Sequence, residues 1–181
     1  ARVPFMLGTH TLAYFESSDW KGALLPYQGE SYGFIVLVPK EKLSVADVAT
    51  RFSKSVAQQV LHSRDYLQVK LSMPRFKIRE GRDLAEVIAK FGAPTAFSGD
   101  ANFSGMSTLP ARISQIQHEC VVETDEEGTE AAAATALIMP LGAMPGARLV
   151  KELRADRPFV FAIVHLSSGA PMYLGIVGDP R

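Results

Sequence analysis

The stretch from Glu126 to Gly146, EEGTEAAAATALIMPLGAMPG, decides how the rest of this sequence is interpreted. Alanine is the best helix former, so propensity alone predicts a surface helix or an alanine-rich linker here. The context favours a different structure, because the segment continues directly from a predicted strand and has no apolar stripe with which a helix could dock. Its small side chains suit a segment that enters an existing sheet as an additional strand, with Gly128 as the hinge.

In an extended conformation, successive side chains of this segment point to opposite faces of a sheet. One face would carry Thr129, Ala131, Ala133 and Thr135, and the other face would carry Glu130, Ala132, Ala134 and Ala136. The first proline of the segment is Pro140, so nothing before it prevents backbone pairing. The pattern therefore predicts a loop that can insert between two strands at little steric cost.

Strand signals dominate the remainder of the chain. Alternating or continuous apolar runs predict strands or extended segments at residues 8–16, 20–27, 32–39, 66–78, 111–128, 159–166 and 172–178. The last two should form a hairpin, and Pro74 should break the strand in which it lies. The fold class is mixed α+β with more strand than helix. A sheet built only from these strands would leave apolar edges open, so we expect a further part of the fold to cover them.

Helix signals are fewer but well defined. Ser44 and Asp47 resemble a capping box before an apolar pattern that runs to Phe52, and a second short helix is predicted at residues 56–61. The clearest helix follows Asp83, a fair N-cap, and ends at Gly92 in the position that favours a left-handed conformation. Its apolar residues Leu84, Val87, Ile88 and Phe91 form one stripe.

Composition and charge bound the function classes. The chain has 181 residues, which suits one domain, and its formal net charge of zero implies no general attraction to nucleic acid or to an anionic membrane. Its longest apolar runs are far shorter than the ~20 residues that span a bilayer. Cys120 is the only cysteine, so neither an internal disulfide nor a thiolate zinc cluster can form. The compartment stays open, with an extracellular location favoured over a cytoplasmic one.

Catalytic signatures are missing from the sequence. None of the four histidines is paired with a second histidine or a carboxylate at ligand spacing on a predicted helix, and no phosphate-binding loop or nucleophile elbow occurs. Cys120 lies in the middle of a predicted strand, where a buried, inert thiol is favoured. Residues 102–104, Asn-Phe-Ser, match the N-glycosylation pattern, which matters only if the protein is secreted. We therefore expect no enzyme, no cofactor and no metal site.

Several motifs together resemble the serpins, the family of serine protease inhibitors. They are LPYQGESYGFIVLVPKE at residues 25–41, LSMPRFKIREGRDLAEVIAKFG at 71–92, NFSGM at 102–106, QHECVVETDEEGTEAAAATA at 117–136, ADRPFVFAIVH at 155–165 and APMYLGIVGDP at 170–180. They occur in the order that the family shows. Asn102 replaces the usual aspartate. The resemblance covers residues 1–181 but only the C-terminal half of a serpin domain, so it implies a missing N-terminal half.

The resemblance implies a serpin fold with a large mixed sheet, barrel-like sheets and helices. Residues 126–157 would be the hinge and the reactive-centre loop. The hinge residues would be Glu126, Glu127, Gly128, Thr129, Glu130, Ala131, Ala132, Ala133 and Ala134. His118 matches a histidine that acts in sheet opening, and Arg75 with Glu126 matches a charged pair at the top of the sheet. Such an exposed pair contributes only ~0–1 kcal/mol and would tune insertion.

The function implied by the resemblance is suicide inhibition of a serine protease. Counting from the hinge glycine places the reactive bond between Gly142 and Ala143. Met139 and Met144 each precede a proline, before which proteases rarely cut, although a cut after Leu141 or Ala143 remains an alternative. Small and aliphatic residues in this window favour an elastase- or chymotrypsin-like target. A cut after Arg148 by a trypsin-like protease also stays open.

Two other functions remain as alternatives. A non-inhibitory serpin, such as a carrier or chaperone, would keep the fold but would have bulky or charged residues in the hinge. A truncated interaction module is the third possibility. The expected partners are the target protease and the N-terminal half of the same domain, without nucleic acid or membrane.

Overall fold

The computed structural model describes residues 3–41, 43–52, 56, 60–61, 66–125 and 150–179. The chain divides into two compact units, which are described separately below. The first unit comprises residues 1–76 and 124–181, and the second comprises residues 77–123.

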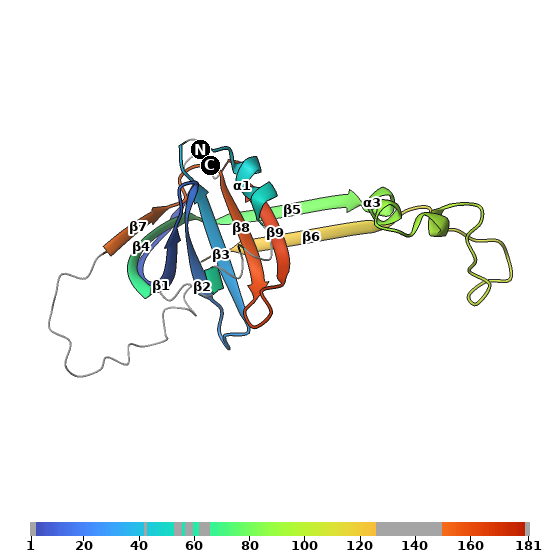
Figure 1. Ribbon diagram of the computed structural model, residues 1–181, viewed down its shortest axis with the longest axis horizontal. Helices are drawn as coiled ribbons and strands as arrows, with labels where there is room; N and C mark the ends of the chain where they lie inside the picture. Colours follow the sequence, from blue (N-terminus) through green and yellow to red (C-terminus); the bar gives the residue numbers. More distant parts are fainter. Residues whose placement is uncertain are drawn as a thin grey trace. The chain divides into compact units, whose positions relative to one another are not determined.

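The first unit is built on a seven-stranded sheet with the order β7-β4-β1-β2-β3-β8-β9 (Figure 1). Its strands are β1 (Phe5–Glu16), β2 (Trp20–Pro26), β3 (Tyr32–Pro39), β4 (Tyr66–Pro74), β7 (Val150–Arg154), β8 (Phe159–His165) and β9 (Pro171–Val177). All neighbouring strands pair antiparallel except β4 and β7, which are parallel. The expected strand-rich α+β class with a large mixed sheet is therefore confirmed.

β3 shows why a continuous apolar run predicts a central strand. It pairs with β2 on one side and with β8 on the other. Gly33 to Pro39 are all buried, because helix α1 and neighbouring side chains leave neither face of the strand in solvent. A strand buried on both faces needs no polar alternation, which agrees with the sequence FIVLV at its centre.

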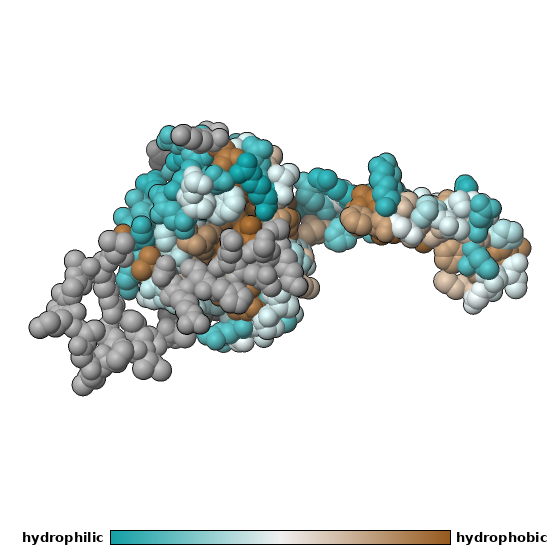
Figure 2. Space-filling model, viewed as in Figure 1, coloured by the Kyte–Doolittle hydropathy of each residue, from teal (hydrophilic) through white to brown (hydrophobic). Residues whose placement is uncertain are grey.

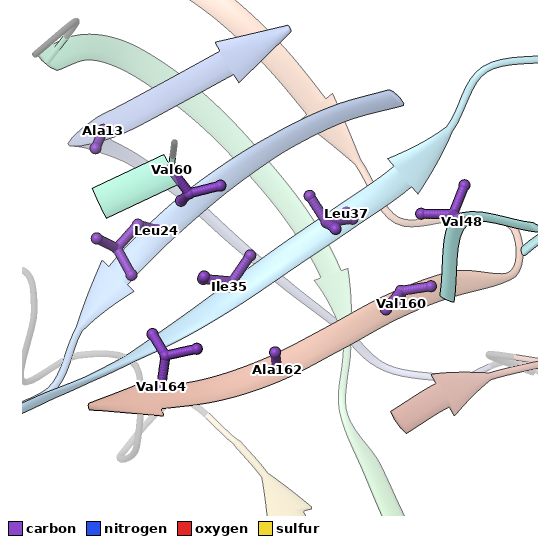
Figure 3. Packing of buried hydrophobic residues seen from close by; sticks show 9 residues of the cluster. All are labelled: Ala13, Leu24, Ile35, Leu37, Val48, Val60, Val160, Ala162 and Val164. Atoms are coloured by element: carbon purple, nitrogen blue, oxygen red, sulfur yellow. The ribbon is translucent and has the colours of Figure 1, made fainter. Parts of the chain in front are cut away.

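The main core lies on the face of the sheet that α1 (Val45–Arg51) covers. Figure 3 shows nine of its side chains converging from several strands, from α1 and from Val60. Ile35 and Leu37 of β3 and Val160 of β8 are almost completely buried. Burying one such side chain contributes roughly 1.5–3 kcal/mol, so this cluster supplies much of the stability of the unit.

The local signals around α1 are confirmed. The Ser44 hydroxyl accepts a hydrogen bond from the Asp47 amide at 3.1 Å, and the Asp47 carboxylate accepts one from the Ser44 amide at 3.3 Å. This reciprocal capping box is the one that the sequence predicted. Of the second predicted helix, residues 56, 60 and 61 are described and are helical. Val60 is 1% exposed and contributes to the core.

The C-terminal hairpin of β8 and β9 is also confirmed. Its connection contains Gly169 at a positive φ of 68°, a conformation that glycine adopts without strain. A bulge between Ile163 and Val164 shifts the register of the two strands. β9 lies at one end of the sheet, opposite β7, and most of its side chains are exposed.

The second unit contains most of the two-stranded pair of β5 (Phe76–Asp83) and β6 (Gln117–Thr124), with α3 (Ala85–Lys90) and the short 3-10 helix Pro94–Phe97. Ion pairs join Lys77 to Glu123 at 2.6 Å and Arg79 to Glu119. Residue numbers rise along β5 while they fall along β6, as expected of antiparallel strands. The predicted strand at 66–78 is thus two strands, and β4 ends at Pro74 as predicted.

The predicted extended segment at 111–128 is a strand only over β6 among its described residues. The residues before β6 make their hydrogen bonds elsewhere. The Ile113 amide donates to the Ala96 carbonyl at 3.0 Å, and the Ile116 amide donates to the Asp83 carboxylate at 3.0 Å. These bonds satisfy the backbone without a strand partner, so the ladder begins only at Gln117.

Helix α3 forms where the sequence predicts it, with a different N-cap and the predicted glycine at its C-terminal end. Leu84 is the N-cap, while the Asp83 carboxylate accepts the Ala85 amide at 2.9 Å from one position earlier. At the other end, Gly92 has a φ of 116°, and the amides of Gly92 and Ala93 donate to Ala89 and Ile88, as in a Schellman motif. The apolar stripe of this helix is exposed, with Phe91 89% accessible.

Candidate functional site

The candidate site is the segment from residue 126 to residue 149 and the strands that hold its two ends. All predicted hinge residues, Glu126 to Ala134, lie outside the described residues, and so do Leu141, Gly142, Ala143, Met144 and Arg148. The structure describes β6, which precedes the segment, and β7, which follows it. Of the predicted hinge and reactive-centre loop at 126–157, residues 150–157 are described, and Val150–Arg154 within them is a strand.

β7 receives the chain directly after the segment. It runs parallel to β4, with Lys151 opposite Val69 and Leu153 opposite Leu71. The Ala155 amide continues this ladder by donating to the Ser72 carbonyl at 2.8 Å. Leu153 is 1% exposed, whereas Val150 at the start of the strand is 58% exposed. The C-terminal end of the segment is therefore fixed to the sheet by one short strand.

An ionic cluster lies on the inward face of β7. The Glu16 carboxylate at the end of β1 is 2.9 Å from the Lys40 ammonium and 3.5 Å from the Lys151 ammonium. The Tyr14 hydroxyl donates to the same carboxylate at 3.1 Å, and the Lys151 ammonium lies 5.6 Å from the centre of the Tyr14 ring. Tyr14 and Glu16 are near neighbours on β1, whereas Lys40 and Lys151 are distant from them and from each other in sequence. No local pattern could therefore have indicated that the two lysines meet Glu16.

The cluster changes the pKa values of its members. The hydrogen bond from Lys40 is the largest influence on Glu16. Together with the hydrogen bond from Tyr14 and the positive charges of Lys40 and Lys151, it lowers the pKa of the carboxyl to about 2 against the opposing effect of desolvation. Burial, followed by the charge of Glu16, raises the pKa of Tyr14 to about 12. At neutral pH the carboxylate is therefore charged and the phenol neutral, which suits the hydrogen bond between them.

A hollow of about 660 Å³ lies beside this cluster within the first unit. Its charged lining balances four basic side chains, Lys21, Lys40, Arg154 and Arg157, against four acidic ones, Glu16, Glu41, Glu152 and Asp156. Most of these charges are already paired, including Arg154 with Asp156 at 3.3 Å. The hollow therefore has no excess charge with which to select an anion or a cation.

His118 and Cys120 lie in β6, as the sequence predicted. The His118 side chain is exposed, and the sheet-opening role stays a prediction. Cys120 is half-buried, so its burial is less complete than the sequence suggested. The alternation of polar and apolar residues in β6 leaves Val122 as the buried apolar side chain of this strand.

Arg75 lies between β4 and β5, where its side chain is exposed and its amide donates to the Pro4 carbonyl at 3.0 Å. Its predicted partner Glu126 lies outside the described residues, so the charged pair stays a prediction. Asn102 is exposed, and its side-chain oxygen accepts the Ser104 amide at 3.1 Å. This is the local turn that aspartate also makes, which explains how asparagine can replace it here.

No group of three or more His, Cys, Asp or Glu side chains within the described residues is arranged to hold a metal ion. Among the helices that the structure describes, none combines the length and the apolar character needed to span a bilayer.

Comparison with known proteins identifies the family. A family model described as "Serpin (serine protease inhibitor)" matches residues 1–180. The chain belongs to the serpin family. Serpin B6 of Macaca fascicularis is 36% identical over 182 residues, covering 99% of the chain and 48% of that serpin. The leukocyte elastase inhibitor of Bos taurus is 38% identical over 168 residues, covering 86% of the chain and 42% of the inhibitor.

Solved structures agree with this assignment. The native state of tengpin, a thermophilic serpin, has a TM-score of 0.76 and 28% sequence identity, covering 97% of this chain and 46% of tengpin. Serpin-12 of Manduca sexta, with a TM-score of 0.75 and 21% identity, supports the fold alone. The chain spans about half the length of the serpins that it matches. What a complete serpin does therefore enters below as a proposal.

Proposed function

We propose that this serpin is a suicide inhibitor of a serine protease. The observation that carries the proposal is the hinge sequence after Gly128, in which Thr129 and Ala131 to Ala134 have small side chains and no proline interrupts them. A hinge of this composition can enter a sheet, whereas bulky or charged residues facing inward would oppose entry. The printed names of relatives point the same way, since two of them are leukocyte elastase inhibitors.

The proposed mechanism begins as ordinary proteolysis. The protease serine attacks the carbonyl carbon of the reactive bond, the peptide bond breaks, and the new amino end leaves while the serine oxygen holds the acyl group as an ester. The freed segment then inserts into the sheet as a strand and carries the esterified protease with it. Distortion of the protease stops water from cleaving the ester. The driving force is the stability that insertion adds to a metastable fold.

The active molecule in this proposal is a complete serpin, in which this chain is the C-terminal part of the domain and an N-terminal half supplies the rest. Two sets of exposed apolar side chains support this part of the proposal. Met172, Leu174 and Ile176 of β9 are each at least 41% exposed, and Phe91 of α3 is 89% exposed. Figure 2 shows apolar residues at the surface in the view that it presents. Side chains of this kind are normally covered in a stable protein.

The proposed reactive bond joins Gly142 to Ala143, within a window from Leu141 to Met144. Pro140 and Pro145 bracket the window, which restricts its backbone to extended conformations and disfavours cleavage immediately before either proline. No charge occurs between them, so a protease pocket for small or aliphatic side chains is the best match. We therefore propose an elastase- or chymotrypsin-like target.

The test mixes the complete protein with a panel of serine proteases and examines the products by denaturing electrophoresis and mass spectrometry. A detergent-stable covalent complex with an elastase- or chymotrypsin-like protease, and a new amino terminus inside the window, is the expected result. Cleavage in the window without a covalent complex would instead indicate a non-inhibitory serpin. A stable complex whose new amino terminus is Leu149 would move the reactive bond to Arg148 and the target to a trypsin-like protease.

A further inference from the structure

Strand β7 is held less firmly than the strands inside the sheet. It has five residues, it lies at one end of the seven-stranded sheet, and β4 is its one hydrogen-bonded neighbour among the described strands. This pairing is parallel, a geometry that is slightly less stable per residue than the antiparallel one. Val150, Glu152 and Arg154 are exposed, so the inward-facing residues Lys151 and Leu153 must supply most of the side-chain attachment.

Lys151 makes contacts that the backbone ladder of β7 does not make. Its ammonium lies 3.5 Å from the Glu16 carboxylate and above the Tyr14 ring. Both residues belong to β1, which is separated from β7 by β4 in the sheet. The sheet curls enough that β7 also contacts β2, which explains how the side chain reaches this far. Lys151 therefore joins the end strand to a strand with which it shares no hydrogen bonds.

The Glu16 carboxylate that Lys151 contacts is also held by two other side chains. Glu16 is held by Lys40 at 2.9 Å and by the Tyr14 hydroxyl at 3.1 Å, so little conformational freedom remains to be lost. The side chains of Glu16, Lys40 and Lys151 are each about one-third exposed, so solvent screens them less than fully exposed pairs. By contrast, Arg154 pairs with Glu152 and Asp156, which are close to it in sequence and bind it to no other strand.

We propose that Lys151 is a positioning residue that fastens β7 to β1 through Glu16 and Tyr14, and thereby fixes the C-terminal end of the segment that meets the protease. The second part of this inference rests on the proposed function. The chain passes from residue 149 directly into β7, so release of β7 would free the segment at that end. A loop fixed at both ends loses less conformational freedom on binding a protease than a loop fixed at one end.

The test compares variants of the complete protein by hydrogen exchange and by inhibition kinetics. Lys151→Met keeps an apolar stem against the Tyr14 ring but removes the charge, and Glu16→Gln removes the other charge. In both variants we expect the amides of β7 to exchange about two- to fivefold faster, with the amides of β8 unchanged. The association rate with the protease should fall about as much, and Lys151→Arg should restore both values.

The matched control is Glu152→Gln, which removes a charge from the adjacent residue of β7 without touching Glu16. Unchanged exchange in β7 of both Lys151→Met and Glu16→Gln would overturn the attachment. Faster exchange with an unchanged association rate would overturn the positioning role. If the parent protein inhibits no protease, the proposed function fails, while the exchange measurement still decides whether Lys151 holds β7. If Lys151→Met does not fold, Glu16→Gln provides the same comparison.

Discussion

At the scale of single residues, the turn between β2 and β3 contains the one described non-glycine residue with a positive φ. Glu30 has a φ of 52° and follows Gly29, whose φ is 84°. The turn is closed by hydrogen bonds between Tyr27 and Tyr32 and between Glu30 and Tyr27. A left-handed conformation costs an ordinary L-residue roughly 1–2 kcal/mol, and asparagine tolerates it better than glutamate.

We therefore expect Glu30→Asn to stabilise the complete protein by about 0.5 kcal/mol. Thermal unfolding should show a small rise in the melting temperature. Gln28→Asn is the control, because Gln28 has no positive φ and should respond little. A lower melting temperature for Glu30→Asn alone would show that the Glu30 side chain contributes more than its backbone conformation costs.

A second residue-scale prediction concerns the pH dependence of Glu16. Its pKa is about 2 in the folded protein, below the value of 4.5 for a free glutamate, with the Lys40 hydrogen bond as the main cause. A lowered folded pKa means that the stabilisation is present above the unfolded pKa and is lost as the pH falls toward the folded one. The effect is reduced by solvent, because the side chain is one-third exposed.

The parent protein should therefore be more stable than Glu16→Gln at pH 7, and the difference should shrink steadily from about pH 5 downward. Chemical unfolding at pH 7, 5 and 3.5 measures this difference. Glu152→Gln is again the control, since its carboxylate lies 4.0 Å from one arginine and is exposed. A difference that stays constant over this range would contradict the assigned role of the Glu16 charge.

At the scale of elements, a core strand and the proposed hinge need side chains of different size. A strand such as β3 is stable because large apolar side chains fill both of its faces. An inserting strand must instead pass between neighbours that are already packed, so small side chains reduce the steric barrier. Under the proposed function, this difference is the reason why Ala131 to Ala134 would suit a hinge better than a core strand.

Replacing Thr129 with arginine should therefore convert the inhibitor into a substrate. A charge carried into a sheet costs several kcal/mol unless it is paired, so insertion would become too slow to trap the acyl-enzyme. Electrophoresis after mixing with the target protease should show cleaved serpin and little covalent complex. Thr129→Ser is the matched control and should keep the complex. An undiminished yield of complex from Thr129→Arg would exclude this view of the hinge.

At the scale of the whole molecule, the exposed apolar side chains of this chain are of the kind that a further part of the fold would cover. β9 has no neighbour on its outer side among the described strands, and the apolar stripe of α3 is uncovered. An open strand edge with apolar side chains promotes association between chains. The 181 residues expressed alone should therefore aggregate or form soluble oligomers.

Size-exclusion chromatography of residues 1–181, with and without a co-expressed N-terminal half, tests this prediction. Co-expression should give a 1:1 complex that unfolds cooperatively, whereas the isolated chain should elute in the void volume or bind a hydrophobic dye. A monomer that unfolds cooperatively without any partner would refute it. It would favour the truncated interaction module as the function.

The features that could be predicted from the sequence are those whose causes are local. Apolar periodicity predicted the strands, and the capping box at Ser44 and the glycine at position 92 predicted two helix ends. Each of these signals depends only on residues that are close together in sequence. The hinge, predicted from its composition and from neighbouring motifs, lies outside the described residues and stays a prediction. The strand prediction failed where residues distant in sequence compete for the backbone hydrogen bonds. Residues 113–116 hydrogen-bond to Ala96 and Asp83 instead of extending β6.

Only the tertiary structure decided which distant residues meet. The sequence by itself determined that this chain is a strand-rich part of a serpin, and it predicts a hinge at residues 126–134. It did not determine that β7 pairs parallel to β4, or that Lys151 reaches Glu16 and Tyr14. The strand order and the curl of the sheet bring these side chains together, and both result from packing of the whole core. An isolated charge in a sequence carries no sign of its partner, because attraction between charges depends on distance in space.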